Sequence, residues 1–475
     1  MKTALHDLSA HDLLAGYKAR DFSPVEVTQA VLAQIERWEP QLAATYLLRP
    51  EAALAQARAS EARWLKGEPC GTLDGVPVTI KDNIATQGDP VPLGTKAVAL
   101  TPAAADAPPA ARLRESGAVI VCKTTMPDYG MLSSGLSTFH KTARNPWDVT
   151  RTPGGSSAGA GAAAAAGYGP LHIGTDIGGS IRLPAAWCGV VGLKPSLGRV
   201  PIDPPYMGRA AGPMTRSVAD AALMMQVLAQ PDARDSMALP PQAIDWSLAW
   251  RADKPLKGVR IGLLLNAGCG LPVEPAIRVA ALHAAHLFEG QGAVVTSLAP
   301  FMTQELLAGL DHFWRMRSLV DLDALPAERR ASVLPVIRDW ADSARAMSGA
   351  DVFRAYSATH AVRVATQEAL QPFDYVISPV SPNAPAPFDW PSPTNDPLRG
   401  LEHIGFTVPF NMGEQPAISV NCGTMDSPGT PGAVLPIGLQ IAGQRFDDLG
   451  VLQMARAFEQ LRGPQRDWPQ PPMTK

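Results

Sequence analysis

The fold is decided by the stretch from Arg151 to Pro201, which reads RTPGGSSAGAGAAAAAGYGPLHIGTDIGGSIRLPAAWCGVVGLKPSLGRVP. Its turn Gly154-Gly155-Ser156-Ser157 is followed by small residues only, a pattern that suits a helix packed close against another backbone. Further on, two glycines stand directly before Ser180, where consecutive backbone N–H groups can point into one concavity. Such a nest can hold an anion or a developing oxyanion.

Each glycine turn also has a plain explanation as a loop, because glycine most often serves turn geometry. A phosphate-binding loop is a rival interpretation, but the pattern GxxxxGK[ST] is absent. Residues 258–270, GVRIGLLLNAGCG, do not meet the GxGxxG pattern of dinucleotide-binding loops.

Short apolar runs alternate with glycine-rich turns and helical spacers from about residue 71 to 200, and again from 256 to 300. Sheet-like runs return later as YVISPV, AISV and PIGLQIAG. This alternation predicts an α/β fold. Residues 1–68 are predicted to be an N-terminal helical segment packed on a main domain of residues 69–475. Within that domain, residues from about 303 to 370 are predicted to form a mainly helical cover.

Composition excludes several functional classes. The 475 residues are 46% hydrophobic and 18% charged, as expected for a globular protein with a large core. A formal charge of -3 argues against a nucleic-acid partner, which would require a concentrated basic face. The longest apolar stretch is short and rich in Ala and Gly, so no membrane partner is expected.

Five scattered cysteines without CxxC spacing indicate reduced thiols and a cytoplasmic protein. His283 and His286 lie three residues apart on a predicted helix, but no third ligand is evident, so no metal site is expected.

Lys81 ends the apolar run Val76–Ile80 and precedes Asp82-Asn83. A lysine at the end of a buried strand is expensive to keep charged, so pairing, snorkelling or a lowered pKa must follow. Pairing or snorkelling is the more common outcome for such a residue taken alone. A lysine held neutral can instead act as a general base.

Taken together, these segments resemble the amidase signature family. The resemblance spans about residues 8–460, in the expected order, through GVPVTIKDNI, GAVIVCKTTMPDYG, NPWDVTRTPGGSSAGA, GTDIGGSIRLPAAWCGVVGLKPSLGRVP, GPMTRSVADAA, VPFNMGEQPAISV and LPIGLQIAGQRFDD. One departure is Ala158, where the family usually has glycine. The resemblance implies a large mixed β-sheet sandwiched by helices, with the active site at one edge.

The resemblance also implies a Ser-Ser-Lys triad without metal or organic cofactor. Ser180 would be the nucleophile, and Ser156, following a cis peptide bond, would bridge it to the base Lys81. The backbone N–H groups of four successive residues would form the oxyanion hole: Ile177, Gly178, Gly179 and Ser180.

Other residues are assigned supporting roles. Asp176 and Arg182 are expected to orient the oxyanion turn, and Ser157 is expected to cap the following helix. Met131, Tyr206 and Met207 are candidate substrate-pocket residues, although core packing is an equal alternative for each. The pocket is expected to be built by loops near residues 128–140, 203–209, 303–350 and 380–410. Trp314, Phe353 and Phe388 would favour an aromatic or apolar acyl group if they faced it.

The resemblance therefore implies an amidohydrolase that converts a small-molecule carboxamide to a carboxylate plus ammonia or an amine through an acyl-enzyme. A homodimer is compatible with it. One alternative is the A subunit of glutamyl-tRNA amidotransferase, a glutaminase that depends on a partner. Another is a catalytically inactive binding protein on the same scaffold.

Overall fold

The computed structural model describes residues 3–248, 256–465 and 467–471. Its centre is a mixed sheet that contains eleven strands within the described residues, in the order β1-β3-β2-β4-β6-β5-β10-β11-β9-β7-β8. The strands are β1 Thr45–Tyr46, β2 Pro77–Lys81, β3 Val119–Thr124, β4 Leu171–Asp176, β5 Val191–Lys194, β6 Ala210–Thr215, β7 Arg260–Leu263, β8 Val294–Ser297, β9 Tyr375–Pro379, β10 Ala417–Asp426 and β11 Val434–Gly443.

Parallel pairing joins β2 to β3 and β4, and β7 to β8 and β9, whereas the central strands pair antiparallel. Strand β2 is buried at all five positions and rich in β-branched residues, as expected of a strand covered on both faces. The mixed sheet predicted from the sequence is confirmed.

The helices are α1 Ala10–Ala19, α2 Pro24–Leu42, α3 Pro50–Lys66, α4 Pro108–Glu115, α5 Ala158–Ala166, α6 Arg182–Cys188, α7 Val218–Leu228, α8 Pro275–Glu289, α9 Gln304–Asp323, α10 Ala327–Ala331, α11 Pro335–Asp342, α12 Gly349–Leu370, α13 Val408–Met412 and α14 Asp448–Leu461. Short 3₁₀ turns cover Leu5–Asp7, Asp128–Gly130, Ser343–Ala346 and Pro397–Arg399.

Helices cover both faces of the sheet. On one face, side chains of α1, α4, α7, α8 and α14 join those of the strands in the largest apolar cluster, where Phe288 of α8 stacks on Phe458 of α14. On the opposite face, α5 packs with α2 and α3 in one cluster and with α6 in another. Alternation along each strand supplies apolar side chains to both layers.

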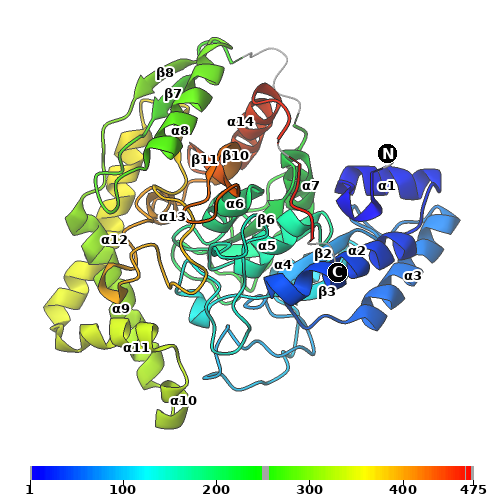
Figure 1. Cartoon of the computed structure of the whole chain (residues 1–475), viewed down its shortest axis with the longest axis horizontal. Coiled ribbons are helices and arrows are strands. Elements are labelled where there is room, and N and C mark those ends of the chain that lie inside the picture. Colours follow the sequence, from blue (N-terminus) through cyan, green and yellow to red (C-terminus); the bar gives the residue numbers. More distant parts are fainter. Residues whose placement is uncertain (1–2, 249–255, 466, 472–475) are drawn as a thin grey trace.

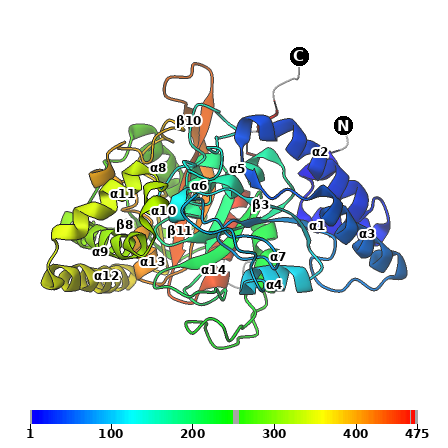
Figure 2. The same cartoon turned by 90° about the horizontal axis from the view of Figure 1, so that it is seen from below.

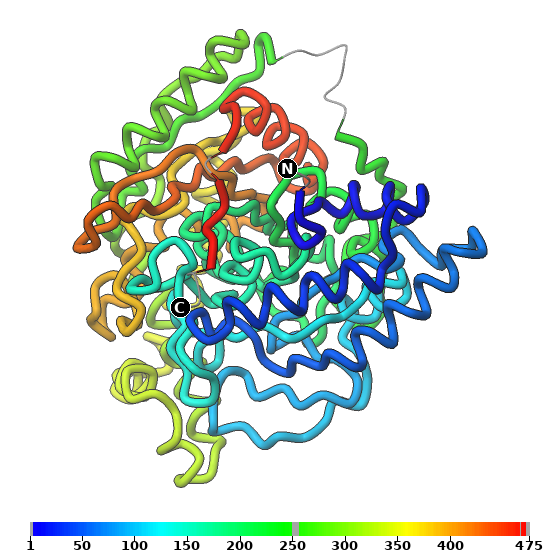
Figure 3. The backbone as a smooth tube through the Cα atoms, turned by 45° about the vertical axis from the view of Figure 1, so that its right-hand side comes forward, coloured from blue at the N-terminus to red at the C-terminus, as the bar shows by residue number. Residues whose placement is uncertain are grey.

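Two groups of helices flank this core on opposite sides. In Figures 1 and 2, α1–α3 lie on one side of the molecule and α9, α11 and α12 lie on the other. The N-terminal segment is not purely helical, because β1 pairs with β3 at the edge of the sheet. Residues 463–465 and 467–471 run back from α14, as Figure 3 shows. Trp468 packs against Trp147 and under the guanidinium of Arg216. Among the described helices, none is long and apolar enough to cross a bilayer.

Candidate active site

Lys81 is the last residue of β2 and its side chain is completely buried. Its Nζ lies 2.8 Å from Ser156 Oγ, 3.0 Å from Ser157 Oγ and 3.0 Å from Thr175 Oγ1. Strands β2 and β4 are parallel neighbours, so their carboxyl ends bring Lys81 and Thr175 to the same edge of the sheet. Three hydroxyl oxygens therefore surround the amine.

Burial lowers the pKa of Lys81 to about 7, and the nearby carboxylates of Asp176 and Asp82 only partly oppose this shift. A large fraction of the amine is therefore uncharged near neutral pH. An uncharged amine has a lone pair that can accept a proton from a neighbouring hydroxyl.

Ser156 is held in a tight turn immediately before α5. The Gly155–Ser156 peptide bond is cis, as the resemblance to the amidase signature family implied. A Cβ at Gly155 would lie 2.6 Å from the main-chain oxygen of Leu132 and from the main-chain nitrogen of Ser134, so only glycine fits there. Helix α5 is built only from Ala and Gly and is buried along its whole length, which lets it pack closely behind this turn.

Ser157 plays a different part from the one expected. It occupies the N-cap position of α5, but its side chain makes no capping hydrogen bond to the helix. Instead, Ser157 Oγ donates to the Thr175 carbonyl at 3.2 Å and accepts from Lys81 Nζ. The expected cap is wrong because the buried amine and the end of β4 bind this hydroxyl.

Ser180 lies in the turn between β4 and α6. Its carbonyl accepts a hydrogen bond of 3.1 Å from the Ser157 N–H, which ties this turn to the Ser156 turn. Gly179 has φ of +127°, a conformation that L side chains rarely adopt. Thr407 Oγ1 donates to the Gly178 carbonyl at 2.6 Å and fixes the orientation of that peptide.

The structure corrects one member of the expected oxyanion hole. The Gly179 N–H donates to Asp176 Oδ1 at 2.8 Å and is already satisfied. Ile177, Gly178 and Ser180 line the adjacent cavity, and Gly179 is not among the described lining residues. The family resemblance could not reveal that the Gly179 N–H is occupied, because this depends on where the Asp176 carboxylate points.

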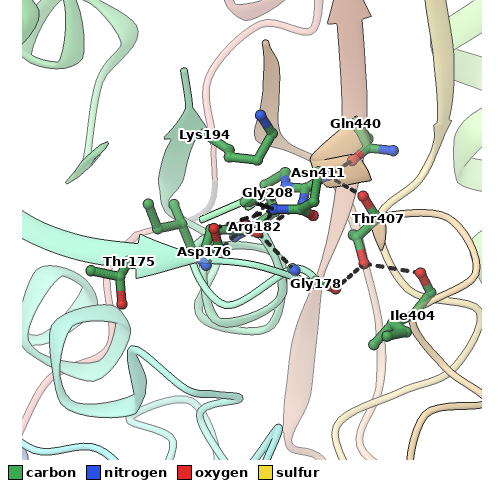
Figure 4. Close-up of polar contacts among 12 residues, drawn as sticks. Thr175, Asp176, Gly178, Arg182, Lys194, Gly208, Ile404, Thr407, Asn411 and Gln440 are labelled. Carbon is green, nitrogen blue, oxygen red and sulfur yellow. Dashed lines mark hydrogen bonds and ion pairs between the residues drawn. The ribbon is translucent and has the colours of Figure 1, made fainter. Parts of the chain in front are cut away.

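Asp176 and Arg182 form a buried ion pair beneath the turn, as Figure 4 shows. The Asp176 carboxylate accepts from three backbone N–H groups and from the side chains of Arg182 and Asn411. Burial alone would raise the pKa of Asp176, but Arg182 and the Asn411 amide hold it well below its ordinary value. Arg182 also donates to the Thr407 carbonyl and the Gln440 amide oxygen. This network fits the expected role of orienting the turn.

A cavity of about 120 Å³ opens above the two serines. Its lining comprises Asn83, Tyr129, Gly130, Met131, Leu132, Ser133, Ser156, Thr175, Asp176, Ile177, Gly178, Ser180, Leu183, Arg209, Trp314, Arg317, Ser318, Trp340, Leu401 and Ile404. Trp314, Arg317 and Ser318 share one face of α9 because they are three and four residues apart. No three His, Cys, Asp or Glu side chains among the described residues gather as they would around a metal ion.

The sequence model of the family described as Amidase matches residues 26–452. The chain belongs to the amidase family. Its members hydrolyse carbon–nitrogen amide bonds, so this amidase is an enzyme and the inactive binding protein is set aside.

Relatives of the amidase include two proteins named as the A subunit of glutamyl-tRNA(Gln) amidotransferase. The one from Myxococcus xanthus (strain DK1622) is 35% identical over 96% of this chain and 97% of its own length. The one from Chloroflexus aurantiacus (strain ATCC 29366 / DSM 635 / J-10-fl) is 33% identical over 97% of each.

Solved structures similar to the amidase include enzymes with other names. A bacterial aryl acylamidase of the amidase signature family has a TM-score of 0.86 and 30% identity, covering 97% of both chains. A 6-aminohexanoate cyclic dimer hydrolase has a TM-score of 0.86 and 25% identity, covering 99% of both.

Only some of the pocket residues expected from the sequence line the cavity of the amidase. Met131 and Trp314 line it, whereas Tyr206, Met207, Phe353 and Phe388 are not among its described lining residues. The Tyr206 ring lies against the Arg317 guanidinium, 4.1 Å away, and Met207 Sδ lies 3.9 Å from Thr359 Oγ1.

The two phenylalanines also lie elsewhere in the amidase. Phe353 is 70% exposed, and Phe388 stacks on Arg144. Arg209, Trp340 and Leu401 also line the cavity and lie within the segments expected to build it. They were not singled out, since no local motif marks which side chain of such a segment reaches the cavity.

Proposed function

We propose that this amidase cleaves a small-molecule carboxamide through an acyl-enzyme on Ser180, with Ser156 and Lys81 as the proton relay. The observation that carries the proposal is the buried Lys81 amine, 2.8 Å from a serine hydroxyl that lines the same cavity as Ser180. A base with a pKa of about 7 suits proton transfer at neutral pH.

The reaction would proceed in two halves. Neutral Lys81 accepts the Ser156 proton while Ser156 accepts the Ser180 proton, and Ser180 Oγ attacks the amide carbon. Backbone N–H groups of Ile177, Gly178 and Ser180 would stabilise the oxyanion. The relay returns the proton to the departing nitrogen, which leaves as ammonia or an amine. Water, deprotonated by the same relay, then hydrolyses the ester and frees Ser180.

The cavity wall favours a substrate with an apolar or aromatic portion. Two indole rings and several aliphatic side chains surround the serines: Trp314, Trp340, Met131, Leu183, Leu401 and Ile404. Burying an apolar group against such a wall contributes about 25 cal/mol per Å². This supports small aryl or alkyl amides as substrates.

A second candidate is the partner-dependent glutaminase, favoured by the two relatives that are named as an amidotransferase component. Glutamine carries an ammonium group that a buried site must pair with an anion. Among the described lining residues Asp176 is the one carboxylic acid, and both of its oxygens are bound by Arg182 and backbone N–H groups. The cavity therefore supports hydrolysis of small amides better than hydrolysis of glutamine.

The experiment is to purify the chain alone and to measure ammonia or amine release from a panel of alkyl, aryl and anilide amides and from glutamine. Ser180→Ala serves as the blank. We expect release from at least one small amide and little from glutamine. If glutamine were the only compound to release ammonia, and did so only after a second protein was added, the glutaminase would be favoured.

We also propose that the protein acts in the cytoplasm. The five cysteines are free in the structure, which supports a role in the reducing cytoplasm.

A further inference from the structure

We propose that Arg209 and Arg317 form a binding site for a carboxylate on the substrate, so that the preferred amides carry a carboxylate apart from the scissile bond. The inference rests on the proposed function, because it concerns the same cavity. It adds a recognition element that the relay and the oxyanion turn do not require.

The two arginines reach the cavity from separate parts of the chain. Arg209 immediately precedes β6, and Arg317 lies on α9 beside Trp314. Both line the cavity together with Ser156 and Ser180. A molecule held near the serines is therefore within the same enclosure as two guanidinium groups.

Protein groups leave the charge of Arg209 largely unpaired. Its Nη2 donates to the Pro204 carbonyl, and its Nε is buried with no hydrogen-bond partner in the described part of the chain. Burial, together with the charge of Arg317, lowers the pKa of Arg209. Two carboxylates, Asp203 and Asp235, lie near enough to oppose this shift, but neither forms an ion pair with Arg209 among the described contacts. Asp235 is occupied by the N–H groups of Ile202 and Met237.

Arg317 is only weakly paired. Its Nε lies 3.7 Å from Asp321 Oδ2, and the two side chains are 38% and 52% exposed. Such surface pairs contribute little to stability, because solvent screens them. The Tyr206 ring supports the guanidinium from one side, at 4.1 Å, and limits the directions in which it can point.

The arrangement leaves an excess of positive charge in the cavity. Asp176 is the one acid among its described lining residues, and it is already neutralised by Arg182. Two cations that repel each other in a partly buried space are stabilised by an anion between them. The planar fork of a guanidinium matches the two oxygens of a carboxylate.

The test compares carboxylated amides with uncharged amides of similar size. We would measure kcat/KM for 4-carbamoylbenzoate against 4-isopropylbenzamide, an uncharged amide of similar shape whose substituent does not activate the carbonyl. The monoamides of succinic, glutaric and adipic acid would be measured against butanamide, pentanamide and hexanamide. The parent should prefer the carboxylated member at least tenfold in one or more pairs.

The variants assign that preference to the two arginines. In Arg317→Gln and Arg209→Gln, the ratio of carboxylated to uncharged kcat/KM should fall at least fivefold, while Arg317→Lys should retain part of it. Arg354→Gln is the matched control, because this arginine of α12 is 74% exposed and outside the described lining. Thermal melting of each variant checks that it folds.

The outcomes separate the inference from the proposed function. Equal or better rates for the uncharged members, or ratios unaltered in both glutamine variants, overturn the inference and leave the amidase proposal intact. If no amide reacts but a fluorophosphonate labels Ser180, we would measure how well each amide protects Ser180 from labelling. The inference then requires that each carboxylated amide protect at a lower concentration than the uncharged amide paired with it. If Ser180 is neither acylated nor labelled, both proposals fail.

Discussion

Lys81 Nζ and Ser156 Oγ lie 2.8 Å apart although 75 residues separate them in the sequence. The contact forms because β2 ends at the sheet edge where the Ser156 turn enters α5. The amine is fully buried, and its neighbours at hydrogen-bond distance are the hydroxyls of Ser156, Ser157 and Thr175 and the Thr175 carbonyl. This pair is the physical basis of the proposed relay.

The first prediction concerns the pH dependence of the rate. Burial places the pKa of Lys81 at about 7, and only the uncharged amine can accept a proton. The kcat for a small amide should therefore fall as the pH drops through about 7 and reach a plateau above it. A rate independent of pH between 6 and 9 would contradict a base with this pKa.

The second prediction concerns Lys81→Met. The substitution should lower kcat about 10³-fold by removing the base. In the unfolded chain Lys81 is protonated below its ordinary pKa of 10.5. In the folded protein its pKa is about 7, so it is protonated only below about pH 7. Burial of this lysine therefore costs stability, fully so at and below pH 7 and progressively less toward pH 10.5.

The thermal midpoint of Lys81→Met, relative to that of the parent, should consequently be highest near pH 7 and decline as the pH approaches 10. Melting curves at several pH values measure this difference. A difference that stays constant from pH 7 to pH 10 would show that the amine remains charged in the folded protein over that range.

A third prediction concerns Thr407, a positioning residue whose hydroxyl holds the Gly178 carbonyl at 2.6 Å. Thr407→Val removes a hydrogen bond of about 1 kcal/mol, so kcat should fall about fivefold with little change in KM. Thr407→Ser keeps the hydroxyl and should restore most of the rate. If the serine variant is as slow as the valine variant, the hydroxyl is not what orients the turn.

A fourth prediction concerns the ion pair beneath the turn. Arg182→Met leaves the buried Asp176 carboxylate without its cation, so the free energy of unfolding should fall by about 3–5 kcal/mol. Denaturant unfolding measures this loss, with the exposed Arg278→Met as control. A loss no larger than that of the control would mean that backbone N–H groups and the Asn411 amide stabilise Asp176 without the arginine.

The sequence predicted the α/β sheet because the alternation of apolar runs and turns is local. The cis peptide before Ser156 and the orienting role of Asp176 and Arg182 were implied by the resemblance to the amidase signature family, whose motifs are continuous in this chain. The glycines of those motifs leave the backbone few alternatives.

The errors arose where side-chain direction decides the outcome. Ser157 binds the buried amine rather than its own helix, and the Gly179 N–H is taken by Asp176. The positions of Tyr206 and Arg317 depend on how α9 packs against the segment before β6. These two parts of the chain are about 100 residues apart in the sequence. No periodicity or local motif encodes such a contact.

The central claim is tested most directly by identifying the acylated residue. The chain would be mixed with an activated ester of a small aromatic acid, quenched within one turnover, digested and sequenced by mass spectrometry. The account predicts one acyl group on Ser180, absent in Ser180→Ala and strongly reduced in Ser156→Ala and Lys81→Met. An acyl group on another residue, or undiminished turnover in Ser180→Ala, would contradict it.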